Sequence, residues 1–266
     1  MWEQGATRTP ADARHHQKKF IKLLKDACGR FNLWDVFNDF LYAMAAALSN
    51  PIDKEHFQER EENYLKIMQR YLKRERLLFP QMAAELVESL QACAESGHYE
   101  DILGQTFHEL ELHNKWKGQF FTPQSISDMM GLVAYNEDVI EQSVAKVGYA
   151  TVYEPCCGSG ANLIGFLNAY HEKAGRAANH SNRLMFVAQD LDPRCCWMCY
   201  IQLALYGIPA VVEQRNTLTM KLFDTWYTPA YVLGGWELKE RWRRLVLQMR
   251  SLEKSEAEQM GTQRNL

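Results

Sequence analysis

An acidic residue followed by a small, glycine-rich turn lies near the middle of the chain. Residues 154–160 read Glu-Pro-Cys-Cys-Gly-Ser-Gly and directly follow a strand-like run at residues 150–153. Gly158 and Gly160 allow the backbone to approach a ligand closely, and the first amides of the helix expected next carry partial positive charge. A carboxylate at the strand end suits an ammonium group or ribose hydroxyls better than a pyrophosphate. The turn therefore predicts a nucleoside cofactor such as S-adenosylmethionine.

Two further strand-like runs are followed by polar residues. Residues 184–188 precede Asp190 and residues 209–213 precede Asn216, with an expected helix at residues 193–207 between the two runs. Alternating strands and helices predict a parallel α/β sheet, and ligands bind at the carboxyl ends of such strands. Asp190 is then placed to accept hydrogen bonds from ribose hydroxyls, and Asn216 to contact an adenine edge.

The first 115 residues are predicted to be helical. Apolar residues recur at the helical spacing in several segments there, and Asn50-Pro51 ends one of them. We interpret these stripes as core rather than as a binding surface. The predicted division is a helical N-terminal domain at residues 1–115, a cofactor-binding domain at 116–235, and a C-terminal helix with a polar tail at 236–266.

The composition limits which classes of protein and which partners the chain allows. A chain of 266 residues that is 47% hydrophobic can bury a sizeable core. Its net charge of −3 gives no global attraction to nucleic acid, so a DNA partner requires a local basic face or another subunit. No signal peptide and no apolar run near the length of a membrane span is present, so we expect no membrane partner.

The cysteines predict a reducing cytoplasm and no metal site. Their number, seven, is odd, and they form no regular framework. No second Cys or His pair lies at zinc spacing from the group formed by Cys195, Cys196 and Cys199, so we interpret these three as thiols that pack in a helix.

Three motifs, in this order, resemble the modification subunits of type I restriction systems. They are Gly-Gln-Phe-Phe-Thr-Pro at residues 118–123, the turn at 154–160, and Gln-Asp-Leu-Asp-Pro at 189–193. The likeness covers roughly residues 102–218. That family consists of S-adenosylmethionine-dependent, adenine-N6-specific DNA methyltransferases with a helical N-terminal domain. The resemblance implies a Rossmann-like methyltransferase sheet, S-adenosylmethionine as cofactor, DNA as substrate, and a specificity or restriction subunit as partner.

The resemblance also implies roles for individual residues. The implied cofactor-binding residues are Phe120, Thr122, Pro123, Glu154, Pro155, Gly158, Gly160, Asp190 and Asn216. Thr122 is expected to cap a helix that has Pro123 in its first turn. Asn216 stands where the family usually has Asp; it keeps an acceptor oxygen but weakens the charge-assisted hydrogen bond.

The chain departs from the family at the catalytic signature, Asn/Asp/Ser-Pro-Pro-Tyr/Phe, which holds a flipped adenine. The nearest candidate is Thr228-Pro229-Ala230-Tyr231, with Thr228, Pro229 and Tyr231 as candidate catalytic residues; the alternative is an ordinary turn with exposed aromatics. Because 35 residues follow Tyr231, we expect an incomplete sheet whose open edge is covered by the C-terminal helix or by a partner.

The leading hypothesis is an adenine-specific DNA methyltransferase that transfers a methyl group to a flipped adenine. The alternative is a non-catalytic, S-adenosylmethionine-binding regulatory or anti-restriction subunit. A third hypothesis is methylation of protein glutamine or RNA, and for this activity too the catalytic tetrapeptide is missing from the chain. The basic run at Lys239, Arg241, Arg243 and Arg244 could contact phosphate. We favour a solvated helix face there, with Trp236 and Trp242 packed inward.

Overall fold

The computed structural model describes residues 8–112, 121–175 and 179–263. The N-terminal part is helical throughout its elements, in agreement with the apolar periodicity. Its helices are α1 (Pro10–Asp26), α2 (Leu33–Ser49), α3 (Phe57–Arg70), α4 (Lys73–Arg76), α5 (Leu78–Ser96) and α6 (Ile102–Glu109). Capping residues set several of the boundaries: the Asn32 side chain accepts a hydrogen bond from the Asp35 amide, and α5 ends at Gly97, whose φ is +80°.

The rest of the chain alternates helices and strands. Its elements are α7 (Gln124–Ala134), α8 (Glu137–Val147), β1 (Ala150–Glu154), α9 (Ala161–Ala174), α10 (His180–Arg183), β2 (Leu184–Asp190), α11 (Pro193–Leu205), β3 (Ala210–Asn216), β4 (Lys221–Tyr227), α12 (Pro229–Leu233) and α13 (Trp236–Gln263). The three predicted strands and the helices that follow the first two are all present, so the α/β class is confirmed.

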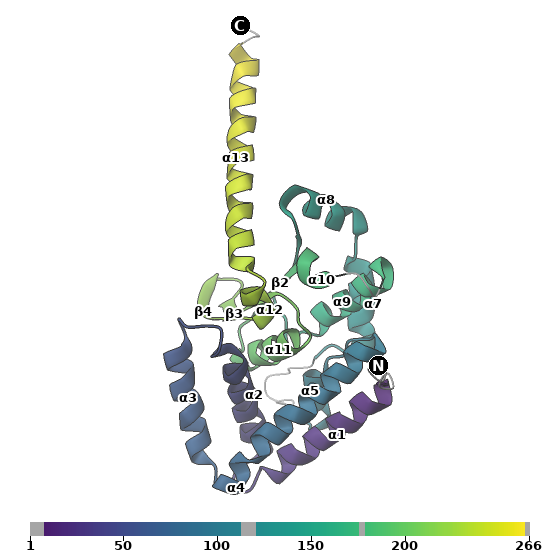
Figure 1. Cartoon of the computed structure of the whole chain (residues 1–266), viewed down its shortest axis with the longest axis vertical. Helices are drawn as coiled ribbons and strands as arrows, with labels where there is room; N and C mark the ends of the chain where they lie inside the picture. Colours follow the sequence, from purple (N-terminus) through teal and green to yellow (C-terminus); the bar gives the residue numbers. More distant parts are fainter. Residues whose placement is uncertain (1–7, 113–120, 176–178, 264–266) are drawn as a thin grey trace, which may run out of the picture.

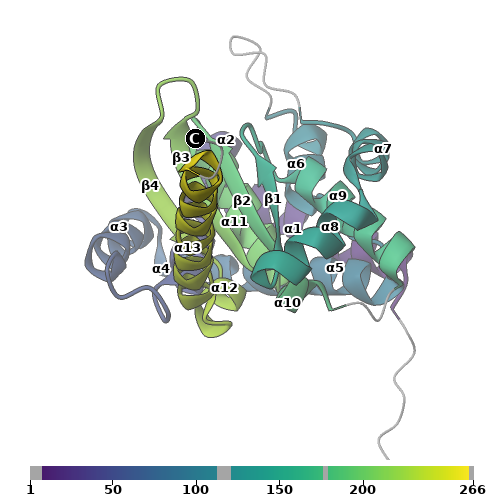
Figure 2. The same ribbon diagram turned by 90° about the horizontal axis from the view of Figure 1, so that it is seen from above.

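The sheet has the order β1-β2-β3-β4 (Figure 2). The first three strands are parallel, as predicted, while β4 pairs antiparallel with β3. No strand was predicted from the sequence at residues 221–227. β4 arises because the chain reverses directly after β3, in a turn where Met220 adopts a φ of +59°. The end of β4 therefore lies beside the beginning of β3, since Tyr227 pairs with Val211.

The two faces of the sheet are covered differently. Since β1, β2 and β3 lie side by side in chain order, right-handed crossovers place α9 and α11 on the same face. Phe186, Val212 and Trp226 on that face are buried in a continuous core that also includes Phe20 and Phe40 of the N-terminal helices. The opposite face carries a smaller cluster, made of Tyr149, Met185, Val211, Tyr231 and Trp236.

Arg60 joins the N-terminal helices to the edge of the sheet. Its guanidinium donates to a carboxyl oxygen of Asp53 at 2.7 Å and to the backbone oxygen of Thr225 in β4 at 2.6 Å, and it lies 3.8 Å from the centre of the Trp226 ring. A buried cation held by a carboxylate, a carbonyl and an aromatic face is well satisfied. This contact fixes β4 against α3.

Two glycines set the crossing of α7 and α9. A Cβ on Gly131 would lie 2.2 Å from the carbonyl oxygen of Gly165, and a Cβ on Gly165 would lie 2.1 Å from that of Ser127. The two backbones are therefore in direct contact, which only glycine permits. This crossing fixes the position of α7 beside α9, the helix that follows the glycine-rich turn.

The long helix α13 extends away from the rest of the molecule (Figure 1). Trp236 at its start is buried, as expected, but Trp242 is 65% exposed, so the expectation that both tryptophans pack inward is wrong for Trp242. Among the helices that the structure describes, none is long and apolar enough to cross a membrane.

Candidate cofactor site

The glycine-rich turn lies at the carboxyl ends of β1 and β2. The Cys157 amide donates to the carbonyl oxygen of Gln189 at 2.8 Å, which ties the turn to β2. Gly158 and Gly160 have φ values of +54° and +99°, in the left-handed region that favours glycine. A Cβ on Gly160 would lie 3.1 Å from the Cys199 sulfur. The turn thus needs glycine for its backbone conformation and, at residue 160, for space.

Asp190 lies at the end of β2 and contacts the turn directly. One carboxylate oxygen accepts a hydrogen bond from the Gly158 amide at 3.0 Å, and the other accepts one from the Asp192 amide at 2.9 Å. Burial raises the pKa of Asp190, and these backbone hydrogen bonds act in the opposite direction. The carboxylate that the sequence predicted to meet the ribose therefore lies against the predicted turn.

The other two strand ends lie at the same edge. The oxygens of Glu154 accept hydrogen bonds from the Cys156 amide at 3.2 Å and the Asn162 side-chain amide at 3.3 Å. The Asn216 side-chain oxygen accepts from the amides of Leu218 and Thr219, at 3.1 and 3.0 Å. Asn216 therefore stabilises the reversal between β3 and β4.

Pro155 and the β3–β4 turn are also connected. The Thr217 hydroxyl donates to the Pro155 carbonyl oxygen at 2.8 Å. The structure thus brings together five of the predicted cofactor residues: Glu154, Pro155, Gly158 and Gly160 of the turn with Asp190. Asn216, the sixth at this edge, is the last residue of β3, and its side chain accepts from the turn that follows.

A buried polar cluster that was not predicted from the sequence lies beneath the turn. The Ser159 hydroxyl donates to Asp101, and the Gln202 side-chain amide donates to the Asp101 carboxylate and to the Ser159 carbonyl, both at 2.8 Å. Asp101 also caps α6, accepting from the Gly104 amide at 2.8 Å. Burial raises the pKa of Asp101, and these hydrogen bonds oppose the rise. The position of Asp101 directly before an apolar helical run is a signal for a helix cap, whereas nothing in the sequence indicates a role for Gln202.

The loop before α7 approaches the turn from the other side. A Cβ on Gly158 would lie 3.1 Å from the Phe121 ring. The Phe121 amide donates to Nε2 of His108 at 3.1 Å, a contact that the sequence did not indicate. Phe120 lies outside the described residues. The expected Thr122 cap is wrong, because α7 begins at Gln124 with Pro123 in the capping position and no side-chain cap.

The structure separates Thr228, Pro229 and Tyr231 from the turn, contrary to the grouping that the sequence predicted. The Thr228 hydroxyl accepts from the Ala210 amide at 2.9 Å and donates to the Ile208 carbonyl at 2.7 Å. Both partners lie at the beginning of β3, whereas Asp190 and Asn216 lie at carboxyl ends. The two ends of β3, at Ala210 and Asn216, are six residue steps apart, or about 20 Å. The cause is the antiparallel direction of β4.

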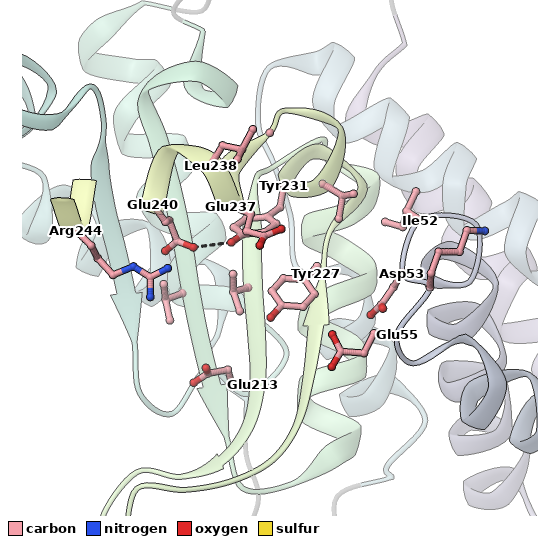
Figure 3. Close-up of a pocket in the computed structure, with 15 residues that line it drawn as sticks. Ile52, Asp53, Glu55, Glu213, Tyr227, Tyr231, Glu237, Leu238, Glu240 and Arg244 are labelled. Atoms are coloured by element: carbon pink, nitrogen blue, oxygen red, sulfur yellow. Dashed lines mark hydrogen bonds between the residues drawn. The ribbon is translucent and has the colours of Figure 1, made fainter. Parts of the chain in front are cut away.

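Tyr231 contributes instead to a pocket on the less covered face of the sheet (Figure 3). The pocket has a volume of about 760 Å³. The Tyr231 hydroxyl donates to the Glu240 carboxylate at 2.5 Å, and its ring stacks on that of Tyr227 with 5.2 Å between centres. Burial, with the nearby Glu240 carboxylate, raises the pKa of Tyr231. The tyrosine thus joins α12 to α13.

Four cysteines in or near the turn pack in the interior, whereas Cys156 is exposed. Cys157, Cys195, Cys196 and Cys199 are buried, and burial raises the pKa of Cys195 and of Cys196. A buried neutral thiol is unreactive. In the described part of the chain, no three His, Cys, Asp or Glu side chains gather as a metal site would require.

Comparison with known proteins identifies one family. The model of the N-6 DNA methylase family matches residues 96–249, which is more than half of the chain. The matched part contains α6, the turn, all four strands and the first half of α13. No curated protein matches the chain.

Proposed function

Because the chain belongs to the N-6 DNA methylase family, we propose that it binds S-adenosylmethionine at the edge formed by Glu154, the glycine-rich turn and Asp190, and that it acts in methyl transfer to adenine N6 in DNA. The hydrogen bond from the Gly158 amide to Asp190 carries this proposal. This hydrogen bond joins the turn that follows β1 to the carboxylate at the end of β2. Doubly wound sheets bind their ligands at this edge.

The donors and acceptors at this edge fit the cofactor. Both oxygens of Asp190 accept backbone hydrogen bonds, and a carboxylate has about four acceptor positions, so capacity for a ribose hydroxyl remains. Glu154 adds a second carboxylate for the ammonium group. S-adenosylmethionine, when bound, supplies an activated methyl group on its sulfonium. We assign Phe120, Thr122 and Pro123 to its methionine end and Asn216 to its adenine.

The substrate and setting complete the proposal. The family points to DNA, with the target adenine flipped out of the duplex. A net charge of −3 gives no general attraction to DNA, which favours a specificity or restriction subunit as a second binding partner. All seven cysteines are free, which suits a reducing cytoplasm.

One observation favours a second candidate, a non-catalytic subunit that binds S-adenosylmethionine and regulates or opposes restriction. The residues nearest in type to the catalytic signature, Thr228 and Tyr231, are hydrogen-bonded within the fold at the opposite edge of the sheet. Neither side chain then meets an adenine beside the turn. Both candidates share the cofactor site and differ in the transfer step.

A methyl-transfer assay separates the two candidates. The purified protein is incubated with methyl-labelled S-adenosylmethionine and mixed-sequence DNA, with and without a type I specificity subunit. Label in adenine N6 that is lost in Asp190→Ala supports the enzyme. Cofactor binding with no label in DNA under either condition contradicts the enzyme and leaves the regulatory subunit. Failure to bind the cofactor contradicts both.

A further inference from the structure

Helix α6 lies beneath the glycine-rich turn, although it belongs to none of the three sequence motifs. The Asp101 carboxylate at its start accepts hydrogen bonds from the Ser159 hydroxyl of the turn and from the Gln202 side chain of α11. A Cβ on Gly104 would lie 2.1 Å from an Asp101 carboxylate oxygen and 2.6 Å from the Ser159 hydroxyl oxygen. Asp101, Ser159 and Gln202 are all buried. The start of α6 is therefore fixed to the glycine-rich turn.

The other end of α6 contacts the segment before α7. Nε2 of His108 lies 3.1 Å from the amide nitrogen of Phe121 and 3.1 Å from its carbonyl oxygen. A neutral imidazole accepts from the amide, and a protonated imidazole donates to the carbonyl. The Phe121 ring packs against Phe107 with 4.9 Å between ring centres, and a Cβ on Gly158 would lie 3.1 Å from it. Phe121 thus contacts both α6 and the glycine-rich turn.

Residues 122–123, assigned above to the methionine end of the cofactor, lie between two attachment points. Phe121 on one side is held by His108. On the other side, the Asp101 amide donates to the side-chain oxygen of Gln124 at 2.9 Å. Both attachments come from α6 and the residue that caps it. One helix therefore holds the two parts of the proposed site, the turn and the segment before α7.

We propose that His108 is a positioning residue of the cofactor site. Its contact with the Phe121 backbone keeps residues 122–123, and with them the proposed contacts to the methionine end, in a fixed position relative to the glycine-rich turn. The inference rests on the proposed function and adds a residue that acts through Phe121. Groups that are held in place before binding lose less entropy when the ligand arrives, so loss of this contact should reduce affinity.

The proposal predicts a loss of affinity that depends on the amino-acid part of the ligand. His108→Leu removes the hydrogen bond to Phe121, so S-adenosylmethionine should bind about 5- to 10-fold more weakly. Methylthioadenosine, which lacks the amino-acid part, should bind His108→Leu as it binds wild type. His108→Gln keeps an amide group that can accept from the Phe121 amide and should restore the affinity for S-adenosylmethionine. His108→Asn, one methylene shorter, should lose affinity as His108→Leu does.

Calorimetric titration of both ligands into wild type and the variants tests this role, with circular dichroism to confirm that each variant is folded. His16→Leu is the matched control, since the half-buried His16 imidazole contacts Glu85 at 2.6 Å within the N-terminal helices, and it should bind both ligands as wild type does. Wild-type affinity for S-adenosylmethionine in folded His108→Leu or His108→Asn, or equal losses for the two ligands, contradicts the positioning role and leaves the proposed function intact. Failure of wild type to bind S-adenosylmethionine contradicts both.

Discussion

Gly160 shows how a single residue shapes the proposed cofactor edge. Its φ of +99° disfavours any side chain, and a Cβ would also press on the Cys199 sulfur at 3.1 Å. Gly148 has a similar φ of +92° but open space around it, because no atom lies within 4 Å of a Cβ placed there. The two glycines therefore share the backbone preference and differ in the contact.

We expect Gly160→Ala to be more destabilising than Gly148→Ala. Both substitutions carry the cost of a left-handed alanine, about 1 kcal/mol, and only Gly160→Ala must also displace Cys199 and α11. Chemical denaturation of both variants measures the difference. Gly160→Ala should also weaken S-adenosylmethionine binding, whereas Gly148→Ala should not. Equal losses of stability would show that Cys199 moves aside freely.

At the scale of elements, Asp101 connects the start of α6 to the glycine-rich turn and α11. Burial raises its pKa above the usual 3.8, so the folded protein binds a proton at this carboxyl more readily than the unfolded chain does. The contribution of Asp101 to stability is thus fully present below 3.8 and is lost as the pH rises through the raised value. The side chain introduced by Asp101→Asn is neutral at every pH in this range.

The free energy of unfolding of wild type relative to Asp101→Asn should therefore increase as the pH falls from 7 toward 4. Urea denaturation of both proteins at several pH values gives this difference directly, and other titrating groups cancel in the comparison. A difference that stays constant, or that decreases toward acid, would show that the carboxyl remains ionised in the folded protein.

Thr228 joins α12 to the beginning of β3, at the edge away from the turn. Replacing it with Val removes the acceptor for the buried Ala210 amide, and we expect a loss of about 1–3 kcal/mol of stability. Cofactor affinity should be unchanged, because the proposed cofactor edge lies about 20 Å away. Thr228→Ser keeps the hydroxyl and is the matched control. A selective loss of methyl transfer in folded Thr228→Val would restore the catalytic role predicted from sequence.

Local sequence signals predicted most helices and strands well, whereas contacts between residues distant in the sequence could not be predicted from them. Strand β1 and the helix that opens at Pro193 were predicted within a few residues, because β-prone runs, capping residues and proline act on their own neighbours. The direction of β4 depends on the antiparallel pairing with β3, and the Asp101–Gln202 contact joins residues 101 positions apart. Neither leaves a mark in the local sequence, so the site could be predicted only in part.

At the scale of the whole molecule, the helices cover one face of the sheet more fully than the other. The parallel strands, taken in chain order, place α9 and α11 on the face that shares the core with α2, while the other face holds a smaller cluster and a pocket of about 760 Å³. The proposed cofactor edge lies at the carboxyl ends of the strands, and α12 with the start of α13 lies at the opposite ends. The proposed cofactor edge and the pocket beside α13 are therefore separate parts of the molecule.

Calorimetric titration of S-adenosylmethionine into wild type and Asp190→Ala tests the central claim most directly. Glu237→Ala is the control, since Glu237 lines the pocket at the start of α13. Charge-assisted hydrogen bonds contribute about 1.5–3 kcal/mol, so Asp190→Ala should bind roughly 10- to 100-fold more weakly. Glu237→Ala should bind as wild type does. Wild-type affinity in folded Asp190→Ala, or no binding by the wild-type protein, would contradict the assignment of this edge as the cofactor site.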